Sequence, residues 1–217
     1  MIKISKIYII FIALLASYQS ILQAAPMSFK GSITSMSTIS KNDSYIESSY
    51  AITSKDSLGI NFNENKGDSY KLKAGEFFYL RRLMRVNEIN SQTNLWLFTS
   101  AGIVNVKENL KDDDYIYLSP TLQFDYETKR VFSMISHQVM RVGNENFDTT
   151  KIEGGFSFYE TDYDETQPWL LLKTRKTSTV DSKFEYTPTL RFINKSLFGE
   201  VGVNLDGDPS FHLMYTF

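Results

Sequence analysis

Strict alternation of apolar and polar residues constrains this chain more than any other feature of its sequence. In the stretch DYIYLSPTLQFDYE (114–127), apolar side chains recur at every second position, at Ile116, Leu118, Leu122 and Phe124. This period of two predicts a β-strand, because successive side chains of a strand point to opposite faces. The alternation covers about the ten residues that a tilted membrane strand needs, whereas strands of soluble proteins average about 5–6 residues.

The same pattern recurs after residue 28, and almost no segment shows the period of a helix. Eleven clusters rich in Asn, Asp, Gly, Ser and Lys separate the alternating segments and supply turn chemistry. They divide the chain into about twelve strands, with ten or fourteen as alternatives, and join them as successive hairpins. One strand, EFFYLRRLMRV (76–86), is irregular because Arg82 interrupts its apolar face.

Strands in hydrocarbon must be closed into a barrel, because no water is present there to satisfy the backbone groups of an open edge. We therefore predict an all-β fold, an antiparallel up-and-down transmembrane β-barrel. The aromatic content of 14% suits the interfacial girdles of such barrels. The alternative is a soluble secreted β-sandwich that acts as a binding module and holds its aromatic residues in a core.

The first residues, MIKISKIYIIFIALLASYQSILQAAPM, have the layout of a secretory signal peptide. Lys3 and Lys6 precede an apolar run (7–16), and the small residues Ala24 and Ala25 follow. The run is shorter than the ~20 residues of a membrane helix. We expect residues 1–24 to be a cleaved signal peptide and residues 25–217 to form one barrel domain.

Composition limits the chemistry and the partners of the chain. It contains no Cys, which excludes disulfides and thiolate catalysis. Its net charge of −2 offers no basic patch for nucleic acid, so we expect no nucleic-acid partner. No motif calls for a cofactor. Two His and no Cys also argue against a dedicated site for a soft metal, so we predict no metal ligands.

The chain ends in SFHLMYTF, with four apolar side chains on one face of a strand, namely Phe211, Leu213, Tyr215 and Phe217. This ending resembles the terminal signature of Gram-negative outer-membrane β-barrels. The resemblance implies that these four residues face lipid and act as an assembly signal read by the barrel-assembly machinery. It also implies location in the bacterial outer membrane, in contact with its lipid and lipopolysaccharide, with the strand's end on the periplasmic side.

Four further stretches, YLRRLMRVNEINSQTNLWLFTSAGI, FDYETKRVF, QPWLLLKTR and TPTLRFINKSLFGEVGVN, are similar to a proteobacterial outer-membrane family. Genes of that family often lie beside heavy-metal or copper efflux genes. The resemblance implies the same fold and location and suggests a link to metal stress. It implies no activity and no catalytic residues.

The polar faces of the strands predict the lining of the barrel. Charges of both signs could form a network that closes the interior, or could line a narrow polar channel. No long inward loop is evident, and about twelve strands enclose less space than the 16–18 of open porins. We therefore expect a narrow or largely occluded lumen. The candidate lumen-lining residues are Arg81, Arg85, Gln123, Asp125, His137, Arg141, Glu153, Glu185, Arg191, Glu200 and His212.

Catalysis by a serine would require a His base beside it, oriented by a third polar group. Ser133 stands four residues from His137 along a strand, and no partner for His212 is evident. We therefore assign no catalytic residue and expect a non-enzymatic protein, either a small passive channel or a structural envelope protein. A lipid-modifying enzyme, such as an acyl hydrolase or acyltransferase, is the alternative. The oligomeric state is left open.

Overall fold

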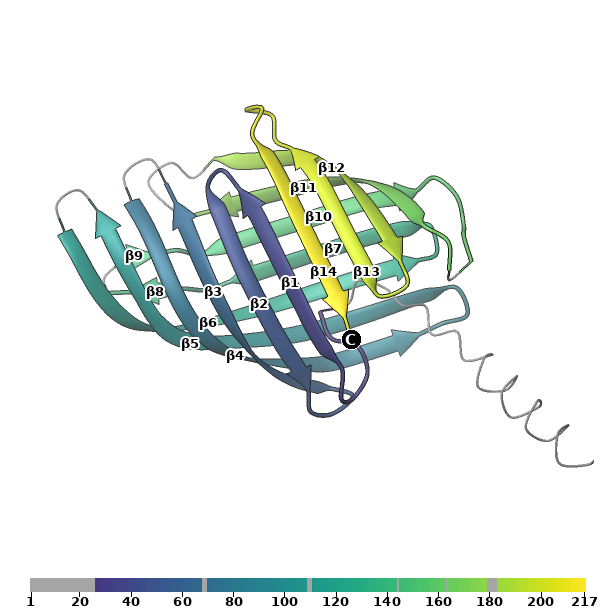
Figure 1. Cartoon of the computed structure of the whole chain (residues 1–217), viewed down its shortest axis with the longest axis horizontal. Coiled ribbons are helices and arrows are strands. Elements are labelled where there is room, and N and C mark those ends of the chain that lie inside the picture. The colour runs from purple at the N-terminus through teal and green to yellow at the C-terminus, as the bar shows by residue number, and fades with distance from the viewer. Residues whose placement is uncertain (1–25, 68–69, 109–110, 144, 163, 179–182) are drawn as a thin grey trace, which may run out of the picture.

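The computed structural model describes residues 26–67, 70–108, 111–143, 145–162, 164–178 and 183–217. Twelve strands close into one antiparallel up-and-down barrel, in which the last strand, β14, pairs with the first, β1 (Figure 1). The predicted fold and strand number are confirmed, and the β-sandwich alternative is wrong. The predicted signal peptide, residues 1–24, lies outside the described residues.

The barrel strands follow one another in chain order, with short connections at the predicted turn clusters. Two further strands, β8 (Arg141–Val142) and β9 (Glu145–Asn146), form a small hairpin between β7 and β10. No helix in the described part of the chain is long and apolar enough to cross a membrane. The barrel strands are β1 (Ile33–Ser40), β2 (Asp43–Ala51), β3 (Asp56–Lys66), β4 (Tyr70–Asn87), β5 (Ser91–Glu108), β6 (Lys111–Thr128), β7 (Val131–Gln138), β10 (Thr149–Ser157), β11 (Gln167–Thr177), β12 (Phe184–Asn194), β13 (Leu197–Val203) and β14 (Pro209–Thr216).

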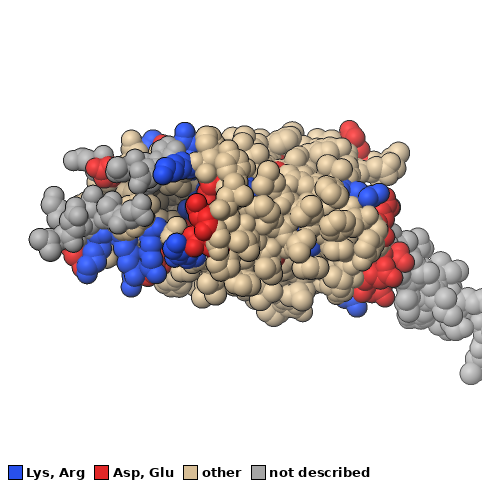
Figure 2. All heavy atoms as spheres, turned by 90° about the horizontal axis from the view of Figure 1, so that it is seen from above, with Lys and Arg blue, Asp and Glu red and all other residues tan. Residues whose placement is uncertain are grey.

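Alternation places apolar side chains on the outside of the barrel. On β6, Ile116 is 86% exposed, whereas its neighbour Tyr117 points inward and is buried. The other strands repeat this arrangement, so an apolar band surrounds the barrel. On the face seen in Figure 2, this band is a largely uncharged zone between two ends where charged residues gather. We call the end at which Phe217 bonds to Ile33 the C-terminal rim, and the opposite end the distal rim.

A β-bulge interrupts the alternation of β4. Arg82 pairs with Trp96 of β5 and Met84 with Leu95, which leaves Leu83 as an extra residue. A bulge moves the following side chains to the other face of the sheet. The alternation in the sequence placed Phe78 and Leu80 on the same apolar face as Arg82. In the structure these two side chains, which come before the bulge, point into the barrel.

Candidate functional site

The barrel encloses a cavity of about 500 Å³, lined by inward side chains of all twelve barrel strands. This volume is within the range of ligand pockets, about 300–1,000 Å³. Carboxylates, amines, amides and hydroxyls share the lining with Met and aromatic side chains. The cavity can therefore hold water and small polar solutes, and it is the candidate functional site.

Arg191 anchors an ion-pair network on the wall formed by β10 to β13. Its guanidinium donates hydrogen bonds to Glu200 at 2.8 Å and to Glu153 at 3.3 Å. Lys173 bonds to the same Glu200 and lies 3.9 Å from Glu153. Arg191 and Glu200 are each only 5% exposed. Charges this far from water require partners, and here two basic groups share two carboxylates.

Aromatic rings hold this network in place. The guanidinium carbon of Arg191 lies 4.5 Å from the ring centre of Phe132 and 4.8 Å from that of Phe198. These contacts stabilise the cation through the ring quadrupoles. His212 packs edge-on against Phe198, with 5.4 Å between ring centres, and its Nδ1 hydrogen-bonds to Thr38 at 2.6 Å. The imidazole is thus a fixed part of the wall.

Inward carboxylates on the opposite wall are bonded mainly to neutral donors. The Tyr117 hydroxyl and the Asn61 amide donate to Glu76 at 2.5 and 2.8 Å. Trp96 Nε1 donates a hydrogen bond to one carboxylate oxygen of Asp125 at 2.7 Å, and the side-chain amide of Asn94 donates to the other oxygen at 2.6 Å. Since neutral donors do not cancel charge, the wall of β2 to β6 is the more acidic, and the wall of β10 to β12 is the more basic.

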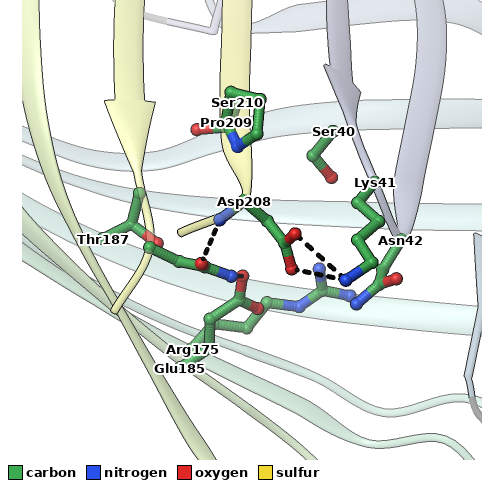
Figure 3. A pocket seen from close by; sticks show the side chains of 10 residues that line it. Ser40, Lys41, Asn42, Arg175, Glu185, Thr187, Asp208, Pro209 and Ser210 are labelled. Atoms are coloured by element: carbon green, nitrogen blue, oxygen red, sulfur yellow. Dashed lines mark hydrogen bonds and ion pairs between the residues drawn. The ribbon is translucent and has the colours of Figure 1, made fainter. Parts of the chain in front are cut away.

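Near the distal rim, an ion pair between Asp43 and Arg175 crosses the lumen. Their strands, β2 and β11, are five strand positions apart by the shorter way around the barrel. Beside this pair lies a recess of about 20 Å³, bordered by Glu185 and by the ion pair of Lys41 with Asp208 at 3.0 Å (Figure 3). These contacts narrow the distal opening.

An apolar cluster fills the lumen near the C-terminal rim. Met27, from the segment that precedes β1, packs with Ala51, Phe78, Leu80 and Trp96. Met27 is 2% exposed and Trp96 is fully buried. The cluster takes up part of the lumen between the polar cavity and this rim, and the expectation of a narrow or largely occluded lumen stays a prediction.

The β8–β9 hairpin folds inward near the distal rim. Its Val142 is buried against Leu72 of β4, Val104 of β5 and Tyr117 of β6. No long inward loop was evident in the sequence, and in the described structure this short hairpin is a connection that turns inward. The hairpin is held by Arg141, which is ion-paired with Asp148. The hydrogen bond from Arg141 lowers the pKa of Asp148 below its ordinary value, against the opposing effect of partial burial.

Most of the predicted lumen residues point into the barrel. Arg85 donates to Asn94 at 2.6 Å inside the C-terminal end of the lumen. The predicted lipid-facing residues Phe211, Leu213, Tyr215 and Phe217 are exposed on the outer surface, and their role as an assembly signal stays a prediction. The predicted lumen residues whose side chains lie on the inner side of the wall are Arg85, Gln123, Asp125, Glu153, Glu185, Arg191, Glu200 and His212.

Three predicted lumen residues are placed elsewhere. Arg81 lies on the outer face of β4, because the bulge comes after it, and pairs with Asp56 at 3.2 Å. His137 is on the outer face of β7, where Thr150 is its hydrogen-bond partner at 2.9 Å. Arg141 belongs to the β8–β9 hairpin and not to a barrel strand.

Several cavity residues were missed by the sequence prediction, namely Asp43, Glu47, Glu76, Lys151 and Arg175. For Glu47 and Lys151 the strands alternate clearly, so their inward direction follows from the outward neighbours Ile46 and Ile152. What the sequence did not contain was the pairing across the barrel that brings them together. Among the residues that the structure describes, no three His, Asp or Glu side chains are gathered as metal ligands.

Comparison with solved structures agrees with the barrel fold. The KdgM porin in complex with disordered oligogalacturonate is similar with a TM-score of 0.50 and 9% identity, over 86% of this chain and 98% of that chain. LpxR from Salmonella typhimurium has a TM-score of 0.47 and 7% identity, over 86% and 99%. At such identity the KdgM likeness shows the fold alone.

No protein-family model and no curated protein matches the chain. The resemblance to a family encoded beside metal-efflux genes therefore stays a prediction.

Proposed function

We propose that this protein is an outer-membrane β-barrel that forms a narrow channel for small polar solutes. The apolar outer band supports the membrane location, because a soluble protein rarely exposes so large a continuous apolar surface. Closure of β1 on β14 supports it as well, since it leaves no unpaired strand edge in hydrocarbon. The C-terminal rim then faces the periplasm and the distal rim faces the exterior.

The membrane location is tested by cell fractionation and gel mobility. Outer-membrane barrels that stay folded without heating migrate differently from the heated, unfolded chain. We expect recovery with the outer membrane and heat-modifiable mobility. Recovery as a soluble periplasmic protein would contradict the proposal.

The observation that carries the channel proposal is the polar cavity of about 500 Å³ inside the apolar band. A cavity lined by charged groups holds water at membrane depth, and its charges select among permeating ions. The apolar cluster around Met27 and the crossing pair of Asp43 with Arg175 make the path narrow. We therefore expect small conductance, with brief openings.

Conductance of the purified protein in planar bilayers tests the channel. Replacing Arg85→Gln removes an inward charge and should shift the reversal potential toward cation selectivity. Arg81→Gln is the matched control, because this side chain lies four residues away on the outer face of the same strand. Lack of conductance at every protein density would contradict the channel and favour a structural envelope protein.

The proposal assigns no catalytic role. The two His side chains are on opposite faces of the barrel wall, and each is hydrogen-bonded to a threonine, Thr38 or Thr150. The alternative, a lipid-modifying enzyme, predicts turnover of phospholipid or lipopolysaccharide that disappears in His212→Ala. We expect no such turnover. A link to metal stress rests on the sequence resemblance only.

A further inference from the structure

Two charged side chains of the cavity, Glu47 on β2 and Lys151 on β10, have no partner of their own. Neither makes an ion pair or a hydrogen bond within the part of the chain that the structure describes, although both line the cavity. In contrast, the lumen charges of Arg175, Arg191 and Glu200 are all engaged in ion pairs. A carboxylate and an amine are thus left for a solute.

The two groups face each other across the lumen. Strands β2 and β10 are six positions apart in both directions around the barrel, which is the largest separation possible with twelve strands. Glu47 and Lys151 interact electrostatically without meeting in an ion pair. The space between them is part of the cavity of about 500 Å³.

Each group has an unsatisfied polar atom beside it that matches its charge. Asn61 is opposite Glu47 in the β2–β3 register, and its carbonyl oxygen Oδ1 is buried without a hydrogen-bond partner in the described structure. Arg175 is opposite Lys151 in the β10–β11 register, and its Nε–H is likewise buried without an acceptor. Buried polar atoms are nearly always bonded, so both call for a partner.

We propose that the lumen binds small zwitterionic solutes, with the ammonium group at Glu47 and Asn61 and the carboxylate at Lys151 and Arg175. The inference rests on the proposed channel and names its solute class. An anion alone would leave the carboxylate of Glu47 unmatched, and a cation alone would leave Lys151 unmatched. Only a molecule with both charges satisfies both ends, so the site discriminates by charge pattern.

Interruption of the ion current by added solutes tests the site. The probes are ω-amino acids of increasing length, namely glycine, β-alanine, γ-aminobutyrate and ε-aminocaproate, and the single-charge controls are butylamine and butyrate. We expect one length of zwitterion to block the current at about tenfold lower concentration than either control, as one added charge-assisted hydrogen bond allows. Equal block by all probes would overturn the inference and leave the channel intact.

Variants assign the block to the two walls. Glu47→Gln and Lys151→Met should each weaken zwitterion block about tenfold, because each variant removes the charge at one end of the site. Lys73→Met, a change at an outward exposed lysine, should leave the block unchanged. Retained zwitterion block in both single variants would overturn the site.

If the purified protein does not conduct, the channel proposal fails while the site can still be measured. Calorimetric titration of the folded protein in micelles with the same probes then decides. Heat of binding for a zwitterion that is lost in Lys151→Met supports the site. No heat for any zwitterion overturns it.

Discussion

Arg191 illustrates how single residues set the properties of the lumen. Its guanidinium is almost fully buried, is bonded to two carboxylates and lies between two phenylalanine rings. The removal of Arg191 leaves two buried carboxylates to share Lys173 alone, so one negative charge is uncompensated, which is more harmful than the loss of a whole pair.

Arg191→Met should lower the free energy of unfolding by about 3 kcal/mol or more. In Arg191→Met combined with Glu200→Gln, most of this loss should be recovered, because Lys173 and Glu153 then balance each other. Arg81→Met, which breaks an exposed pair, should change the free energy of unfolding much less than Arg191→Met does. Urea titration in micelles measures all three, and an additive double variant would contradict the network.

The ion pair of Asp148 with Arg141 should make the stability of the β8–β9 hairpin depend on pH. Because its hydrogen bond from Arg141 lowers its pKa in the folded state, the stabilisation is complete above the ordinary aspartate pKa of about 3.9 and is lost as the pH falls through the lower folded value. The hydrogen-exchange protection factors of residues 141–143 and 145–148, relative to the intrinsic exchange rates at the same pH, should therefore fall at low pH. In Asp148→Asn this decrease should be absent, and an unchanged pH profile there would contradict the assignment.

Alternation predicts most of the strand faces correctly, and its failures have identifiable causes. The direction of Arg81 depends on a bulge, and the position of a bulge is set by pairing with β5, which local sequence does not reveal. His137 shares the parity of Val131 and Ile135, so the pattern itself indicated an outward side chain. Only its polarity argued for the lumen, and at the end of β7 it instead bonds to Thr150 on the outer face.

Contacts between strands that are distant in sequence could not be predicted. The pairing of Asp43 with Arg175, and the packing of Val142 on β4 to β6, depend on how the closed barrel brings its walls together. The period of two shows which side chains of a strand point inward. Which partner an inward charge meets depends on how the sheet curves and closes into a barrel. The composition of the lumen was therefore predictable, and its network was not.

The close approach of β4 and β5 predicts that alanine will destabilise the barrel at one glycine and be tolerated at another. A Cβ on Gly102 of β5 would collide with the carbonyl oxygen of Gly75 and the Cα of Glu76, both backbone atoms of β4, whereas a Cβ on Gly199 of β13 would meet nothing within 4 Å. Gly102→Ala should lower the free energy of unfolding by about 1–3 kcal/mol. Gly199→Ala should stay within about 0.5 kcal/mol. Equal urea midpoints would contradict the close approach.

At the scale of the whole molecule, the lumen is divided along its axis. Apolar packing around Met27 takes up part of the lumen near the C-terminal rim, the polar cavity lies between the rims, and the crossing pair with the β8–β9 hairpin narrows the distal rim. The resistance to ion flow should therefore be concentrated at the ends.

Met27→Ala combined with Trp96→Ala should raise the single-channel conductance severalfold, because the apolar cluster then leaves space for water. Met84→Ala is the matched control, since Met84 is 41% exposed on the outer surface. Bilayer recordings at equal salt compare the variants. Unchanged conductance in the double variant would place the main constriction elsewhere.

The pairing of β14 with β1 also determines which step of barrel folding comes last. The two strands meet through pairs such as Thr34 with Thr216, which are 182 positions apart in the chain. Contacts of such sequence separation form late and slowly, because a long loop must be closed first. Until β14 arrives, the backbone of β1 remains a free edge on which strands of other chains can pair. The state of this protein that is most open to pairing with other chains is therefore a nearly complete barrel in which β1 and β14 are not yet joined.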